Sequence, residues 1–254
     1  MSAAPQVALP RWIDIGLLPI INLVQALIVA GLVVLVIGVN PFDAMRIMAW
    51  GAVYDSVAIS YTLYYATDFV FTGLAVAVAF RARFWNIGGE GQLLAGAMAA
   101  AFVGARESLP GWSLVPAMIL AGSLAGAATA ALPAALRVRL KVDEVVATLM
   151  LNFVIFYAMM ALLDGPWKDP LSGYPDSPDI RMEAEFPALV SGTRLHLGVL
   201  LAGLAAIGIW LLITRTTLGF QIRAIGANPR AAAHGGMSVG RVVLVAAAIS
   251  GALA

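Results

Sequence analysis

Polar and ionisable side chains interrupt the apolar stretches of this sequence, and the chemistry they offer is hydrogen bonding, either between helices or to a polar group that passes along them. Inside a bilayer such groups are costly, and they commonly mark a transport path, a proton relay or contacts between helices. The residues that lie within or at the start of the long apolar runs are Asp68, Glu90, Gln92, Asp143, Glu144, Thr148 and Asn152.

Some of these polar residues recur at helical spacing. Glu144, Thr148 and Asn152 are separated by one helical repeat each, so they lie along one face of a helix. Lipid cannot solvate a polar stripe, and the face must therefore turn toward other helices or toward a water-filled path. Both interpretations stay open, because hydrogen bonds between membrane helices stabilise a fold by about 0.6 kcal/mol each.

Several kinds of active site are missing from the sequence. A P-loop needs Gly-x-x-x-x-Gly-Lys-Ser/Thr, but Lys141 and Lys168, the only lysines, do not follow glycine. The absence of cysteine excludes disulfides and thiolate metal sites, and we expect neither a metal nor a cofactor. Ser250-Gly251 faintly resembles the nucleophile region of rhomboid proteases, but no histidine follows it. We therefore predict that the chain is not an enzyme.

The composition is that of an integral membrane protein. Of 254 residues, 61% are hydrophobic and 11% are charged, with a mean hydropathy of +0.92, whereas soluble domains carry about 25% charged residues. Helical spans of about 20 residues then predict an all-α, polytopic transmembrane helix bundle, with about six full spans and a truncated seventh in one domain. Gly122 and Gly126 allow close helix packing. The predicted spans are Ile15–Val39, Ser60–Phe80, Ile87–Ala105, Ser113–Leu136, Glu144–Leu163, His196–Ile213 and Val242–Ala254.

Both ends of the sequence bear on this prediction. The apolar run after Arg11 is longer than the 7–15 residues of a signal-peptide core, so we expect it to remain as a span. Val242–Ala254 is too short to cross, and a helix that ends within the bilayer leaves carbonyl groups unsatisfied. We therefore expect a C-terminally truncated sequence, with a short interfacial tail as the alternative.

The distribution of Lys and Arg predicts the orientation, because cytoplasmic loops carry an excess of both. With the N-terminus inside, the irregular, acidic and proline-rich segment 164–195 is an external loop, and the basic segment 214–241 is a cytoplasmic loop. The inner side then carries Arg11, Arg81, Arg83, Arg137, Arg139, Lys141, Arg215, Arg223, Arg230 and Arg241, and the outer side carries Arg46, Arg106, Lys168, Arg181 and Arg194.

Two stretches are poorly suited to an uninterrupted membrane helix. Asn86–Gln92 (Asn-Ile-Gly-Gly-Glu-Gly-Gln) is either an interfacial turn or an unwound segment that protein or water must cover.

In the 214–241 loop, Phe220–Ile225 suits an amphipathic helix, and Asn228-Pro229 suits the N-cap and first position of another helix. Gly235-Gly236 ends that second helix. A short helix in such a loop is a natural docking element for a soluble partner. The alternative is a helix lying on lipid, for which its alanine-rich face offers little anchoring.

Motifs in these stretches resemble those of the permease subunits of ATP-binding-cassette importers, in the branched-chain amino acid and simple-sugar permease superfamily. In the loop they are Leu218-Gly219, Arg223–Pro229, Ala231-Ala232 and Gly235, followed by Ser250-Gly251. Asn86–Gln92 and Asp143–Asn152 resemble motifs of the branch that transports nucleosides and simple sugars with a lipoprotein-type binding protein.

The resemblance implies a multi-pass subunit of the cytoplasmic (plasma) membrane that imports a nucleoside or simple sugar by alternating access. Its implied partners are ATP-binding-cassette ATPase subunits, a second permease in a homo- or heterodimer, and an extracytoplasmic solute-binding protein, but no nucleic acid. The implied substrate path comprises Asn86, Gly88, Glu90, Gln92, Glu144, Thr148 and Asn152, to which polarity adds Asp68. The implied ATPase-coupling residues are Arg223, Gly226, Asn228, Pro229, Ala231, Ala232 and Gly235.

The alternative function is an ion-coupled secondary transporter of a small polar solute. Glu90 or Asp68 would then be the proton or cation site, and no ATPase would be needed. A neighbouring reading frame that encodes a P-loop ATPase would favour the importer.

Overall fold

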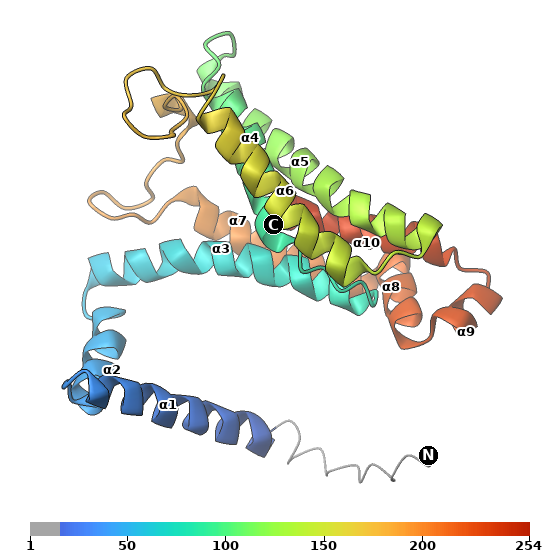
Figure 1. Ribbon diagram of the computed structural model, residues 1–254, viewed down its shortest axis with the longest axis horizontal. Helices are drawn as coiled ribbons and strands as arrows, with labels where there is room; N and C mark the ends of the chain where they lie inside the picture. Colours follow the sequence, from blue (N-terminus) through green and yellow to red (C-terminus); the bar gives the residue numbers. More distant parts are fainter. Residues whose placement is uncertain (1–15) are drawn as a thin grey trace. The chain divides into compact units, whose positions relative to one another are not determined.

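The computed structural model describes residues 16–254 as helices joined by turns and loops, with no β-strand in this part of the chain beyond an isolated bridge (Figure 1). The all-α prediction is confirmed. Arg11 and Ile15, which entered the orientation and the first predicted span, lie outside the described residues. The chain divides into a unit of residues 1–62 and a unit of residues 63–254.

The first unit contains α1 (Leu18–Val36), α2 (Pro41–Gly51) and the beginning of α3 (Ser56–Arg81). Neither α1 nor α2 buries a residue. An apolar helix without buried residues is suited to a lipid environment, because a bilayer solvates the side chains that water would reject.

The second unit contains the rest of α3 and the remaining described helices. They are α4 (Gly89–Gly104), α5 (Gly111–Leu140), α6 (Glu144–Leu163), α7 (Leu197–Arg215), α8 (Thr217–Ala227), α9 (Pro229–His234) and α10 (Val239–Leu253). The connection between α6 and α7 is irregular apart from the short 3-10 helix η2 (Met182–Ala184).

Among the described helices, α1, α3, α5, α6 and α7 are long and apolar enough to cross a membrane. The third predicted span is shorter than expected, because residues 82–88 are not helical and α4 begins only at Gly89. Its 16 residues extend about 24 Å, which is less than the roughly 30 Å of the hydrocarbon core. The last predicted span begins three residues earlier than expected, at Val239.

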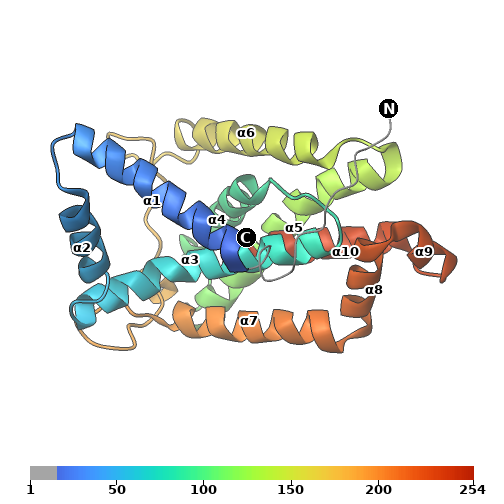
Figure 2. The ribbon, with the colours of Figure 1, turned by 90° about the horizontal axis from the view of Figure 1, so that it is seen from below.

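Helix α5 packs against both α4 and α10 in the second unit (Figure 2). Glycines bring these backbones close together, as the Gly122–Gly126 spacing predicts. A Cβ atom added to Gly96 would lie 3.2 Å from the carbonyl oxygen of Gly122, and one added to Gly126 would collide with the carbonyl oxygen of Gly251. Larger residues at these positions would force the helices apart.

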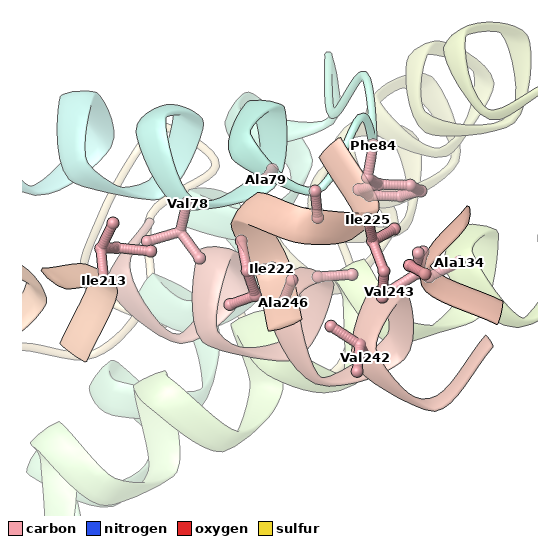
Figure 3. Packing of buried hydrophobic residues seen from close by; sticks show 13 residues of the cluster. Val78, Ala79, Phe84, Ala134, Ile213, Ile222, Ile225, Val242, Val243 and Ala246 are labelled. Carbon is pink, nitrogen blue, oxygen red and sulfur yellow. The ribbon is translucent and has the colours of Figure 1, made fainter. Parts of the chain in front are cut away.

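Buried apolar side chains form one cluster that joins α3, α5, α7, α8, α9 and α10 (Figure 3). Ala82 and Phe84 enter it from the end of α3 and the turn that follows, and Ile222 and Ile225 enter it from α8. The cluster therefore fixes the α8–α9 segment to the chain that leads from α3 into α4.

Candidate functional site

The connection between α3 and α4, residues 82–88, is an unwound segment whose residues alternate between buried and exposed, and we call it the break. Arg83 adopts a left-handed backbone conformation with φ of 52°, which turns the chain at the end of α3. Phe84 is fully buried, and Asn86 is 5% exposed. Asn86 and Gly88 are buried, whereas Trp85 and Ile87 are exposed, so other parts of the protein cover one side of this unwound segment.

A reciprocal pair of amides closes the break onto α4. Asn86 Nδ2 donates to Gln92 Oε1 at 2.9 Å, and Gln92 Nε2 donates to Asn86 Oδ1 at 2.8 Å. Asn86 Oδ1 also accepts the backbone N–H of Gly88 at 3.1 Å, and Asn86 Nδ2 donates to Ser250 Oγ of α10 at 3.0 Å. One side chain thus joins the break, α4 and α10.

The polar stripe of α6 holds the same break from the other side. Thr148 Oγ1 accepts the N–H of Ile87 at 3.2 Å, and Asn152 Nδ2 donates to the carbonyl oxygen of Ile87 at 3.0 Å. Asn152 Oδ1 accepts the N–H of Gly91 at 2.9 Å. Both backbone groups of Ile87 therefore have partners where helical hydrogen bonds are missing.

Glycine is required where the break meets these side chains. A Cβ atom on Gly91 would lie 2.8 Å from Asn152 Oδ1, and one on Gly88 would lie 2.9 Å from Gln92 Nε2. Any larger residue would push the amides out of hydrogen-bonding range. We call Asn86, Gln92, Thr148, Asn152 and Ser250 the polar network.

Glu144 belongs to a neighbouring cluster rather than to the polar network. Its carboxylate lies 2.8 Å from Arg137 Nη1 at the end of α5, and the same nitrogen donates to the carbonyl oxygen of Arg83 at 2.6 Å. Asp143 caps α6, because its side chain accepts the N–H of Val145 at 2.8 Å. The three residues of the predicted stripe therefore share one helix face, but they contact two different sets of partners.

The two remaining carboxylates on the predicted path lie beside cavities. Asp68 lines a cavity of about 500 Å³ together with Phe71 and Ser123. Glu90 is exposed at the start of α4, and it lines one cavity of about 340 Å³ and another of about 230 Å³. Asn86 and Gln92 of the polar network line the first of the two Glu90 cavities, and Asn152 lines the second.

Sequence reasoning missed Ser250 as a member of the network and Arg137 as the partner of Glu144. The sequence singles out Ser250 only by its resemblance to known motifs and not by its polarity. Ser250 is nevertheless fully buried, and its hydroxyl accepts from Asn86. A polar residue in the apolar run of α10 was the available signal.

The α8–α9 segment has the local structure that its sequence predicts. Asn228 Oδ1 accepts the N–H groups of Arg230 at 3.0 Å and Ala231 at 3.1 Å, and Pro229 takes the first helical position of α9. Gly235 is the C-cap, and Gly236 has a positive φ of 82°. Figure 2 shows α8 leaving the end of α7 at a sharp angle, with α9 following it.

Several predicted coupling residues face inward rather than toward a partner. Ala232 is 5% exposed, and Arg223 donates to the carbonyl oxygen of Ile213. A Cβ atom on Gly226 would collide with the carbonyl oxygen of Arg81. Ala231 and Ala233, by contrast, are exposed on α9. Only some of the residues in the motif therefore lie on the outer surface of the segment, where a partner could contact them.

The geometry defines a multi-pass α-helical membrane protein with a hydrogen-bonded break at one helix start and a pair of short helices between two longer ones. The family described as "Branched-chain amino acid transport system / permease component" matches residues 58–254. The chain belongs to this family.

Curated relatives extend the match over nearly the whole chain. A glucose ABC transporter permease protein of Haloferax volcanii is 34% identical, over 98% of this chain and 68% of its own length. A guanosine ABC transporter permease protein of Bacillus subtilis is 31% identical, over 94% of this chain and 69% of its own length. A nucleoside ABC transporter permease protein of Lactococcus lactis is 28% identical, over 94% and 68%. No solved structure matches the chain.

Proposed function

We propose that this chain is the membrane-spanning subunit of an ATP-binding-cassette importer that moves a nucleoside or a simple sugar. The family match over residues 58–254 carries this proposal. The relatives named for guanosine, nucleosides and glucose support the solute class. ATP hydrolysis is assigned to separate ATPase subunits, because the sequence has no P-loop.

The N-terminus and the α8–α9 segment lie on the cytoplasmic side, where the ATPase docks on the exposed face of α9. The excess of arginine in residues 214–241 supports this orientation. The solute arrives on the opposite side from a binding protein, and a second permease completes the membrane part. Residues 164–195 face the binding protein.

The solute passes the carboxylates of Asp68 and Glu90, while the polar network holds the helices that move. Asp68 and Glu90 line cavities, and a carboxylate accepts hydrogen bonds from the hydroxyl groups that nucleosides and sugars share. Alternating access then requires α4 and α6 to tilt as one body around the break.

Transport in proteoliposomes tests the function. The complete permease is reconstituted with its ATPase, partner permease and binding protein, and uptake of labelled guanosine and glucose is measured with ATP inside. We expect uptake that requires ATP and persists after ionophores collapse the ion gradients. Uptake driven by an imposed proton or sodium gradient without ATP would establish the ion-coupled alternative instead.

The docking face is tested separately with exposed residues. Ala231→Glu with Ala233→Glu places charge on the outer face of α9 and leaves the buried Ala232 intact. We expect the ATPase to be lost from the purified complex while the permease stays folded. Ser191→Glu, on the loop assigned to the other side, is the control. Full ATPase retention in the double variant would remove the docking role.

A further inference from the structure

The α8–α9 segment and the polar network are connected through the break. Ile225 of α8 and Phe84 of the break share one buried cluster, and Gly226 lies against the carbonyl oxygen of Arg81. Two residues after Phe84, Asn86 holds Gln92 and Ser250. A displacement of α8 therefore reaches the network along a short and tightly packed stretch of backbone.

Arg137 connects this stretch to a further helix. Its Nη1 donates to the carbonyl oxygen of Arg83 at 2.6 Å and lies 2.8 Å from the carboxylate of Glu144. Its guanidinium carbon is 5.9 Å from the ring centre of Phe84. Glu144 is the first residue of α6. Thr148 of the same helix accepts the N–H of Ile87, which lies four residues after Arg83 in the chain.

The contacts of Arg137 hold the break and α6 as one body. Without Arg137, the turn at Arg83 would have no bond to the start of α6, and α6 would hold the break only further along, through Thr148 and Asn152. A shift of α8 at this turn would then reach α6 less directly. A cavity of about 380 Å³, lined by Arg83, Arg137, Ile225 and Pro229, lies between these elements and leaves room for such a shift.

We infer that Arg137 is a positioning residue that transmits the ATPase-driven movement of α8–α9 to the polar network and α6. This inference rests on the proposed importer function. Arginine suits the task because its planar fork can hold two acceptors at a fixed geometry, whereas the ammonium group of lysine is a point charge on a flexible stem.

If Arg137 only stabilised the fold, its removal would lower assembly, ATP hydrolysis and solute uptake together. The side chain of Arg137 is 30% exposed and that of Glu144 is 14% exposed, and glutamine at position 137 can still donate a hydrogen bond to the Glu144 carboxylate. Arg137→Gln should therefore leave the permease folded and bound to its ATPase while the conversion of ATP hydrolysis into transport fails. The quantity to measure is solute imported per ATP hydrolysed.

The experiment compares Arg137→Gln with Arg139→Gln in the complete transporter in proteoliposomes. Arg139 lies on the same helix turn but is exposed, so it matches the loss of charge. We expect Arg137→Gln to keep ATPase binding and basal hydrolysis and to lower solute per ATP by about tenfold, within the range of typical coupling free energies. Arg139→Gln should behave like wild type.

Arg137→Lys keeps the charge without the fork, and we expect an intermediate ratio of solute per ATP. It also serves as the test if Arg137→Gln fails to fold. An unchanged ratio in Arg137→Gln, or a parallel loss of assembly, hydrolysis and uptake in both variants, would overturn the inference. Absence of ATP-dependent uptake in wild type would instead overturn the importer function.

Discussion

Two regions of the molecule interrupt the long helices, and they treat polar groups in opposite ways. In the break, polar side chains point inward and bond the backbone, as Asn152 does with Ile87 and Gly91. In the α8–α9 segment, apolar side chains point inward, and the helix ends are satisfied locally by caps such as Asn228.

The difference shows how each region must be built. The break begins a helix within the bundle, and side chains distant in sequence, Thr148 and Asn152, bond the backbone groups that its own turns leave free. The α8–α9 segment is partly exposed, so it needs only packing and local caps. Substitutions in the break should therefore be costly, and those in the segment should be costly only at its inner face.

The largest effect is expected from Asn86→Leu. The change leaves Gln92 and Ser250 without their partner, and each buried polar group left unpaired costs about 1–3 kcal/mol, so the free energy of unfolding should fall by roughly 3 kcal/mol or more. Thermal unfolding of the purified complex measures this. Thr72→Val is the control, because the Thr72 hydroxyl bonds only the carbonyl oxygens of its own helix. Equal effects of the two changes would show that the network adds no stability.

The inner face of the α8–α9 segment is tested by Gly226→Ala. The added methyl group would collide with the carbonyl oxygen of Arg81, and overpacking of this kind costs about 1–3 kcal/mol. Gly208→Ala in α7 is the matched control, because nothing lies within 4 Å of its Cβ position. There the substitution should stabilise the helix by about 0.5–1 kcal/mol. A neutral Gly226→Ala in thermal unfolding would contradict the close packing.

A smaller effect is expected from Asn228→Ala, which removes the N-cap of α9. Loss of such a cap costs about 1 kcal/mol, and the effect should remain local. Hydrogen exchange at the amides of Arg230 and Ala231 measures it, since both donate to Asn228. Asn228→Asp keeps the acceptor and should retain protection. Faster exchange in both variants would mean that the cap is not what orders α9.

The smallest effect is expected from Thr148→Val, which removes one bond to Ile87 while Asn152 still holds the same residue. We expect a loss of about 0.6 kcal/mol, the average for such bonds in membranes. Thr129→Val is the control, because its hydroxyl bonds within its own helix. A loss as large as that of Asn86→Leu would mean that the α6 stripe, rather than Asn86, is the main support of the break.

Much of the fold was predictable because it depends on local physics. Apolar runs of sufficient length predict membrane helices, and the caps of α9 follow from residues adjacent in sequence, as Asn228-Pro229 and Gly235-Gly236 illustrate. The third predicted span was too long by its first two residues, because Ile87 and Gly88 are held in the break by Thr148 and Asn86. Nothing in the run itself reveals those contacts.

The sequence by itself determined that the chain lies in a membrane, where its long apolar helices begin and end to within a few residues, and which polar residues are unusual there, but it did not predict α2. The tertiary structure alone decided their partners. Ser250 meets Asn86 across 164 residues of sequence, Glu144 pairs with Arg137, and Ala232 turns inward. Helix position and capping depend on neighbours along the chain, whereas a side chain's partner depends on how helices are rotated and packed against one another.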